Sequence, residues 1–364
     1  MGQEKITFVQ NSQSEFYTVL KERIDNYFTE RGISKNANWL MVFKTIFILS
    51  GTIGTYLVIV LELFNPLVLL LFAILLGFFT ALIGLNIGHD ALHGSYSPNR
   101  KLNHYLGILF NIAGANDYLW KIKHNVIHHT YTNIPEHDDD INQSKVLRME
   151  PNQKWMKIHR YQHIYLFFLY PLSSLSWVFV KDYQKFFTSK ISSHEIKKHP
   201  KKELYRLLIY KAIYYMIYIV IPFTVMDLSW YYILLGFFVL HLVEGASLSF
   251  IFQLAHVFEG TSFPKPQENG KMERSWAEHQ MFTTLDFGRK SPLVNFFFGG
   301  LNFQVEHHLF PNICHVHYAN ISPIVESTAK EFGLPFLENK TFFGALISHV
   351  NMMKKMGNSP AAVA

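Results

Sequence analysis

Residues 66–93 read PLVLLLFAILLGFFTALIGLNIGHDALH, and this stretch decides the fold. Its first part, Pro66–Ile87, is predominantly apolar and long enough to cross a bilayer, which takes about 20 residues. His89 and His93 follow at once, so the same helix should carry them just past the membrane edge. The i,i+4 spacing places both imidazoles on one helix face, where two ring nitrogens can bind one metal ion. The stretch therefore predicts a membrane helix that ends in metal ligands.

Three further stretches are long and apolar enough to span a bilayer, namely Thr45–Phe64, Leu207–Val225 and Trp230–Ala255. Very short turns join the first to Pro66–Ile87 and join the other two to each other, so the sequence predicts two helical hairpins. A fifth stretch, Ile164–Val180, is shorter and contains a proline, and we interpret it as lying in the membrane interface. The expected fold class is all-α integral membrane, with four transmembrane helices in two hairpins and a cytosolic helical cap.

Charge sets the expected orientation. The tight turns lack Lys and Arg, whereas Lys181–Lys211 is rich in them, and positively charged loops stay in the cytoplasm. Both termini and the middle segment are therefore expected in the cytoplasm, and the chain should form an integral, multi-pass membrane protein.

We expect one domain over residues 1–364. Its segments are 1–44 (cytosolic), 45–87 (first hairpin), 88–206 (cytosolic, with the interfacial helix), 207–255 (second hairpin) and 256–364 (cytosolic).

The composition narrows the class of protein. Of the 364 residues, 49% are hydrophobic and only 16% are charged, which excludes intrinsic disorder and a collagenous or coiled-coil chain. The single cysteine, Cys314, excludes an internal disulfide and a cysteine-rich zinc or iron–sulfur site. A net charge of +6 in so apolar a chain indicates loops at a membrane face rather than nucleic-acid binding.

Two more paired-histidine motifs and one further histidine join the first. His124-Asn-Val-Ile-His128-His129 and Gln304-Val-Glu-His307-His308 have helical spacing, with His124 and His128 on one α-helical face and His129 turned away. A lone histidine is more often a core or surface residue, but three paired motifs on one membrane face are hard to explain by packing. Imidazole suits Zn, Cu, Fe and Ni, and about eight nitrogen ligands suit two metal ions, with di-iron ahead of di-zinc or di-copper. The predicted ligands are His89, His93, His124, His128, His129, His256, His307 and His308.

Polar residues near these motifs are candidates for a supporting role, because metal-bound histidines commonly donate to a carboxylate or carbonyl. The possible ligands or supporting groups are Gln304, Asp90, Glu306, Asp138, Asp140 and His279. The acidic run that contains Asp138 could equally be a solvated loop. Trp276, Gln280 and Thr284 share helical spacing and either line a substrate channel or form an amphipathic helix face. The remaining histidines, His315 and His349 among them, are expected to be core or surface residues.

Taken together, HDALH, HNVIHH and QVEHHLFP resemble the histidine boxes of membrane fatty-acid desaturases. The resemblance covers the chain from about His89 to Pro311, and the glutamine that opens the third box resembles the front-end and linoleoyl-CoA-type group. Many members of that group carry a fused cytochrome b5 domain with a His-Pro-Gly-Gly motif, which is not found in residues 1–38 or after Pro311. The resemblance therefore implies a separate electron donor, either ferredoxin or cytochrome b5.

The resemblance also implies the reaction. Two iron ions would form the catalytic centre, O2 would be the co-substrate, and a cis double bond would enter an acyl chain carried on CoA or on a membrane lipid. Unactivated C–H bonds are beyond side-chain acid–base chemistry, so an oxidising metal centre fits an apolar substrate at a membrane face. Two other readings stay open: a lipid hydroxylase or ketolase of the same di-iron superfamily, and a non-enzymatic histidine-rich metal transporter.

Overall fold

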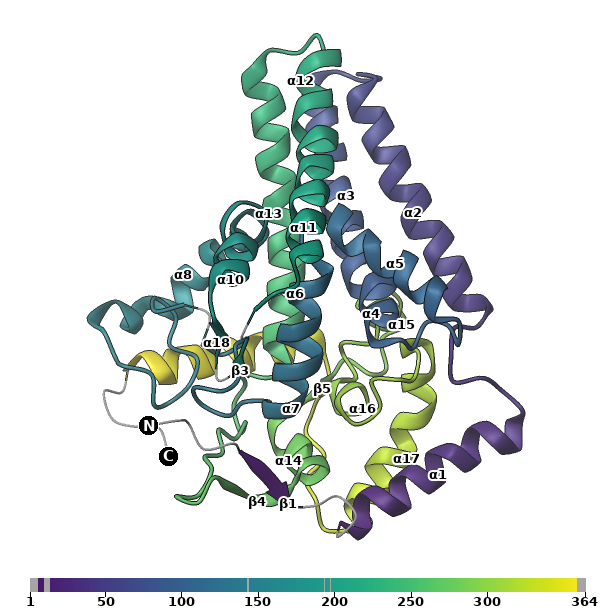
Figure 1. The fold of residues 1–364 in the computed structure, drawn as a ribbon, viewed down its shortest axis with the longest axis vertical. Helices are drawn as coiled ribbons and strands as arrows, with labels where there is room; N and C mark the ends of the chain where they lie inside the picture. The colour runs from purple at the N-terminus through teal and green to yellow at the C-terminus, as the bar shows by residue number, and fades with distance from the viewer. Residues whose placement is uncertain (1–5, 10–13, 143, 193, 197, 359–364) are drawn as a thin grey trace.

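Four long apolar helices form a stalk above a mostly helical body in the computed structural model, which describes residues 6–9, 14–142, 144–192, 194–196 and 198–358 (Figure 1). The candidate spans are Trp39–Val60, Pro66–His93, Lys201–Val225 and Trp230–Leu254. They confirm the predicted fold class of four transmembrane helices in two hairpins. The first span begins and ends earlier than predicted, because Asn38 accepts a hydrogen bond from the backbone of Met41 and starts the helix there.

The second span confirms the continuous helix expected from the opening stretch. Helix α3 (Pro66–Leu82) passes into a π-helical segment, η2 (Ile83–Gly88), and then into α4 (His89–His93) without a break. It packs along α13 (Trp230–Leu254), where a Cβ on Gly77 would lie only 2.3 Å from the carbonyl oxygen of Leu240. The two spans therefore approach closely because Gly77 has no side chain.

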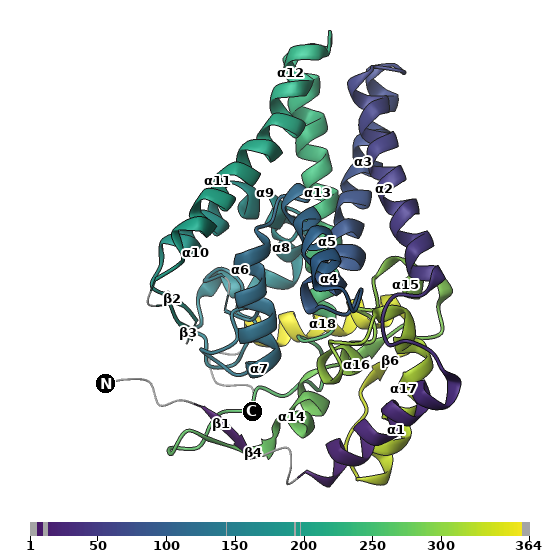
Figure 2. The same cartoon turned by 45° about the vertical axis from the view of Figure 1, so that its right-hand side comes forward.

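The first hairpin pairs α2 (Trp39–Val60) with α3, and the second pairs α13 with α11 (Lys201–Tyr215), η6 (Met216–Val220) and α12 (Ile221–Val225). Figure 2 shows the hairpins separating toward their tight turns. An apolar cavity of about 380 Å³ lies between them there, lined by residues such as Tyr56 and Leu228. This cavity is at the end of the stalk remote from the histidine motifs.

The fifth apolar stretch does not continue as one straight span. Its helices Lys157–Leu169 and Ser173–Phe187 meet at a bend of 82°. Gly245 of α13 accommodates the bend, because a Cβ there would lie 2.1 Å from the carbonyl oxygen of Pro171, and Ser249 Oγ donates to the carbonyl of Tyr170. Such a bent pair is compatible with an interfacial position, which stays a prediction. Its parts are η4 (Lys157–Tyr161), α8 (Gln162–Leu169), α9 (Ser173–Ser176), η5 (Trp177–Lys181) and α10 (Asp182–Phe187).

Short helices and three two-stranded sheets make up the body. Helix α1 (Glu15–Arg31) packs its buried stripe, which includes Phe16, Leu20 and Ile24, against α17 (Tyr318–Glu331). The sheets pair β1 (Thr7–Val9) with β4 (Lys271–Ser275), β2 (Lys190–Ile191) with β3 (His194–Glu195), and β5 (Asp286–Phe287) with β6 (Glu338–Asn339). The remaining helices are α5 (Arg100–Ile112), α6 (Asp117–Lys121), η3 (Ile122–His128), α7 (His129–Tyr131), α14 (Trp276–Thr283), α15 (Pro292–Phe297), α16 (Gln304–Leu309), η7 (His315–His317) and α18 (Phe342–Asn358).

Candidate metal centre

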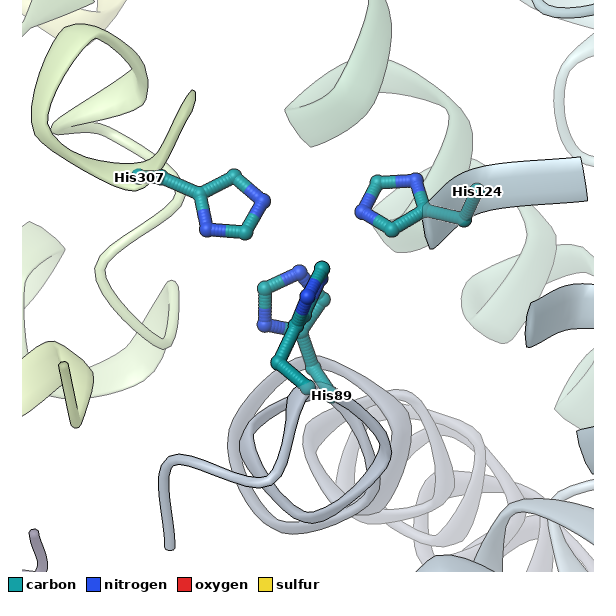
Figure 3. A group of neighbouring side chains, drawn as sticks. His89, His124 and His307 are labelled. Atoms are coloured by element: carbon teal, nitrogen blue, oxygen red, sulfur yellow. The ribbon is translucent and has the colours of Figure 1, made fainter. Parts of the chain in front are cut away.

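All eight histidines predicted as ligands meet in the body, directly below the stalk. Their ring nitrogens form overlapping groups in which the candidate ligand atoms lie within 4.8 Å of one another. Figure 3 shows His89, His124 and His307 turning their rings toward a common point from three separate elements. The groups are His89, His93, His124 and His307; His128, His256 and His308; and His129, His307 and His308.

The second histidine motif is not wound as the sequence analysis assumed. Its first five residues lie in the π-helical segment η3, in which residues five apart come onto one face, and His129 follows in α7. His124 Nε2 and His129 Nε2 are therefore only 3.2 Å apart, so the expectation that His129 turns away was wrong for this physical reason. His124 and His128 do share a face, with their rings stacked at 5.3 Å, and His128 also joins His256 and His308.

The cluster has the properties of a metal site. The Nε2 atoms of His89, His93, His256, His307 and His308 are buried and have no hydrogen-bond partner among the described residues. In four of the clustered histidines the pKa is lowered well below the ordinary value of imidazole. Burial is the larger cause and repulsion from neighbouring imidazoles the smaller one. These four are His124, His129, His307 and His308. Neutral imidazole is the form that binds metal, so the unsatisfied nitrogens fit a metal-binding site.

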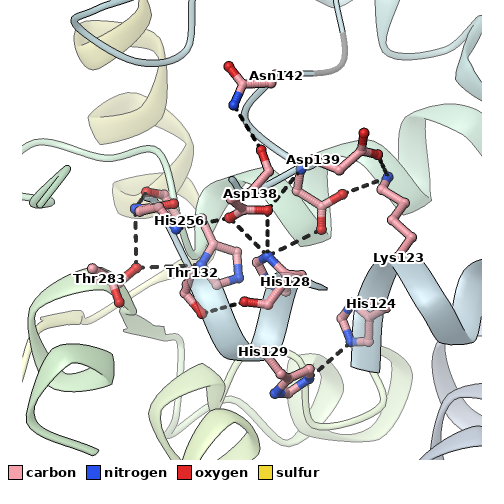
Figure 4. A network of polar contacts seen from close by, with 12 residues as sticks. Lys123, His124, His128, His129, Thr132, Asp138, Asp139, Asn142, His256 and Thr283 are labelled. Atoms are coloured by element: carbon pink, nitrogen blue, oxygen red, sulfur yellow. Dashed lines mark hydrogen bonds and ion pairs between the residues drawn. The ribbon is translucent and has the colours of Figure 1, made fainter. Parts of the chain in front are cut away.

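Asp138 supports the second histidine motif. Both of its carboxylate oxygens lie 3.1 Å from His128 Nδ1, and the backbone N–H groups of Asn133 and Asp140 donate to the same carboxylate (Figure 4). The carboxylate of Asp140 lies 3.3 Å from His128 Nδ1 and 2.6 Å from Lys123 Nζ. Asp138 is therefore buried against the site and Asp140 is half-buried beside it, so the acidic run is not the solvated loop that the sequence left open.

Helix α14 covers the other side of the cluster. Gln280 Oε1 accepts a hydrogen bond from His308 Nδ1 at 2.9 Å, and Trp276 Nε1 donates to the carbonyl of His129 at 2.7 Å. His279 Nε2 donates to the carbonyl of Thr132 at 2.7 Å. These contacts orient the histidine motifs from outside. They place Trp276 and Gln280 against the histidines rather than in the apolar cavity described below.

Three further candidates lie close by with different contacts. Thr284 Oγ1 donates to the carbonyl of Gln280 within the same helix. Gln304 is buried, and its Oε1 has no hydrogen-bond partner among the described residues. Glu306 lies against Asp286 rather than against a histidine, and burial followed by mutual repulsion raises the pKa of Asp286.

Sequence reasoning missed a buried chain of contacts behind the first motif. Asp90 Oδ2 accepts from His315 Nδ1 at 2.8 Å and from Cys314 Sγ at 3.0 Å, while Oδ1 lies 3.7 Å from His89 Nδ1. On the far side, His315 Nε2 is 2.6 Å from Lys44 Nζ. His315 was expected to be a bystander. The signal that could have found it is Lys44, a cation inside an apolar span, which requires a buried partner.

An apolar cavity of about 380 Å³ reaches the cluster beneath the bent helix pair. It is lined by His124, by large apolar side chains such as Trp120, Trp177, Leu248 and Phe252, and at one part of its wall by Lys123, Asp140 and Lys181. The ring of Phe252 lies 6.0 Å from the ring of His124, so the apolar wall continues up to the candidate metal centre. A long apolar ligand could therefore reach the histidines from the membrane side.

Comparison with known proteins decides the family. The family model for fatty acid desaturase matches residues 64–340. The chain belongs to this family. It is 36% identical to the sn-1 linoleoyl-lipid 6-desaturase of Arthrospira platensis, over 98% of this chain and 96% of that protein. The corresponding enzyme of Synechocystis is 35% identical over 98% of this chain and 99% of its own length. The acyl-lipid (8-3)-desaturase of Physcomitrium patens is 36% identical over 97% of this chain and 74% of its own length.

This desaturase is therefore an enzyme of lipid metabolism with membrane-spanning helices. The family and the histidine cluster together indicate metal binding. The substrate class is a fatty acyl chain, as the resemblance of the histidine boxes implied.

Proposed function

We propose that this desaturase uses two iron ions and O2 to introduce a cis double bond into a lipid- or CoA-linked acyl chain. Electrons would come from a separate protein, ferredoxin or cytochrome b5. The observation that carries the proposal is the convergence of eight histidines, six of which have a buried ring nitrogen without a hydrogen-bond partner among the described residues. A pair of iron ions bound there would supply the oxidising chemistry that an unactivated C–H bond requires.

The proposed ligand sets follow the observed groups. His89, His93, His124 and His307 would hold one ion, and His128, His256 and His308 the other, with His129 near both sets. Asp138 and Gln280 would fix the ring orientation of His128 and His308 through their Nδ1 atoms. Gln304 would hold a bound water or a neighbouring imidazole through its free Oε1.

The apolar cavity would hold the acyl chain. Trp177, Leu248 and Phe252 give it an apolar wall that leads to His124, against which the acyl chain would lie, while Lys123, Asp140 and Lys181 also line the cavity. The proposed substrate position is supported by the named specificity of the relatives. Those of Arthrospira and Synechocystis are named for position 6, and a relative from Dictyostelium discoideum is named a Delta(5) fatty acid desaturase. We infer insertion near the carboxyl end of the acyl chain.

The histidine motifs and both termini would lie on the cytosolic side. The basic stretch 181–211 and the Lys- and Arg-free tight turns support this orientation. Epitope tags placed at both termini and at Lys185 should be reached only from the cytosol. Labelling of Lys185 from outside would overturn the orientation.

Expression in a host that lacks polyunsaturated lipids tests the function. The parent protein should create new double bonds, mapped by mass spectrometry to position 5 or 6, and His308→Ala should create none while remaining in the membrane. A hydroxylase would instead yield hydroxylated acyl chains. A metal transporter would leave the acyl chains unchanged and alter cellular iron, so each alternative has its own outcome.

A further inference from the structure

We propose that a second, polar cavity binds the phosphate of the substrate's headgroup. It borders helix α6–η3, which also borders the apolar cavity. The inference rests on the proposed function and deepens it, because it names what the acyl chain is attached to. The cavity has a volume of about 550 Å³ and is lined by His93, Arg100, Tyr118, Lys121 and Arg206, among others.

This cavity opens onto the candidate metal centre. His93 lines it and is half-buried, whereas the other histidines of its group are buried. Asn125, on the same wall, donates through Nδ2 to the carbonyl of Leu92, while its buried Oδ1 has no hydrogen-bond partner among the described residues. A ligand in the cavity would therefore touch a proposed metal ligand and an unsatisfied polar atom.

Two cations of the cavity are available to a ligand. Arg206 is already held by Asp117 and by Glu203, each at 2.8 Å. The side chains of Arg100 and Lys121, by contrast, are exposed and make no hydrogen bond or ion pair with any described residue. Because Asp117 is the one carboxylate of the wall and is paired with Arg206, the cavity keeps a net positive charge. Arginine and lysine on facing elements are a usual arrangement for binding phosphate.

The two cavities fit the two ends of an amphiphile. Trp120 and His124 line the apolar one, whereas Lys121 and Asn125, each one position further along, line the polar one. The rings of His93 and His124 are only 5.2 Å apart, and the ring of Trp120 contacts both. A headgroup held at Arg100 and Lys121 would place the first carbons of its acyl chain beside His93, with the rest passing Trp120 into the apolar cavity. Because the first acyl carbons would lie beside His93, this placement accounts for insertion of the double bond near the carboxyl end of the chain.

The phosphate could belong to CoA or to a phospholipid, and a binding experiment separates the two. Purified protein is titrated with CoA by calorimetry, and native mass spectrometry counts bound phosphatidylglycerol against a neutral galactolipid. Arg100→Gln/Lys121→Gln should weaken binding of the phosphate ligand at least about tenfold, since two charge-assisted contacts are lost. Lys101→Gln is the matched control, because Lys101 is exposed on the same helix and outside the cavity.

Each outcome decides the proposal. Loss of CoA binding in the double variant supports it with CoA as the source, and selective loss of phosphatidylglycerol supports it with a phospholipid as the source. Equal loss in Lys101→Gln, no loss in the double variant, or no preference of the parent for phosphate over galactolipid overturns it. Arg100→Lys/Lys121→Arg keeps the charges and should keep binding, which excludes misfolding as the cause. Binding needs neither iron nor O2, so this result is independent of whether the proposed reaction occurs.

Discussion

Replacing Asp138 by asparagine should loosen the metal centre without unfolding the protein. The carboxylate is fully buried and accepts four contacts: both oxygens face His128 Nδ1, Oδ2 also accepts from the N–H of Asn133, and Oδ1 from the N–H of Asp140. Asparagine has the same size but replaces one oxygen by an NH2 group. Whichever way the amide is turned, that NH2 group faces a backbone N–H, of Asn133 or of Asp140.

The size of the effect follows from this geometry. The variant loses at least one hydrogen bond and the negative charge opposite His128, so the ring is held less firmly. Removing such a partner of a metal-bound histidine costs about 10- to 100-fold in metal affinity or activity. This corresponds to about 1.4–2.7 kcal/mol.

The assay is the iron retained per chain after dialysis against chelators of increasing strength, measured by elemental analysis and followed by desaturase activity. Asp25→Asn is the matched control, because Asp25 is half-buried on α1 and its carboxylate forms an ion pair with Lys35 at 2.5 Å. Such a surface pair contributes about 0–1 kcal/mol. If Asp138→Asn retained iron as well as Asp25→Asn does, Asp138 would not orient a metal ligand and the reasoning would fail.

Three further outcomes are expected. Gly77→Ala should lower the free energy of unfolding by about 1–3 kcal/mol, and with it the measured thermal midpoint, because its Cβ would meet the carbonyl oxygen of Leu240 at 2.3 Å. Gly54→Ala, with nothing within 4 Å of its Cβ, should be neutral or stabilising. Burial lowers the pKa of His349 from 6.5 to about 4, so below pH 6.5 the unfolded chain binds more protons than the folded one. The free energy of unfolding should therefore fall by up to about 3 kcal/mol between pH 6.5 and 4. In His349→Gln the free energy of unfolding should depend less steeply on pH over this range. Gln304→Ile should lose desaturation and Gln304→His should keep part of it, measured by lipid analysis; full activity of the isoleucine variant would show that the buried amide is not needed.

The spans and the proposed ligands could be predicted because their signals are local. An apolar run of bilayer length can be read from one continuous stretch of sequence. Histidines four residues apart, and Gln304 three and four residues before His307 and His308, indicate one helix face. His256 is the informative exception, since it has no histidine partner in its own motif. Its place directly after a span was enough to include it, because the other clusters also follow spans.

The rest of the site depends on contacts that no local pattern carries. The bond between Asp90 and His315 joins positions 225 residues apart, and that between His315 and Lys44 joins positions 271 apart. The pairing of His124 with His129 needs a π-helical turn, which an extra backbone residue creates and residue types alone do not specify. Sequence spacing therefore identified which histidines take part, while long-range packing decides how they are grouped.

The same packing explains why the site lies at the foot of the stalk. Two spans that cross closely at Gly77 and Leu240 each run on to proposed ligands, the first to His89 and the second to His256. From Gly77 to His89 the helix advances about 18 Å, at roughly 1.5 Å per residue. A change in the crossing angle at Gly77 would therefore be amplified at the histidines. The closely packed spans serve both as the membrane anchor and as the rigid frame that sets the spacing between the two proposed metal positions.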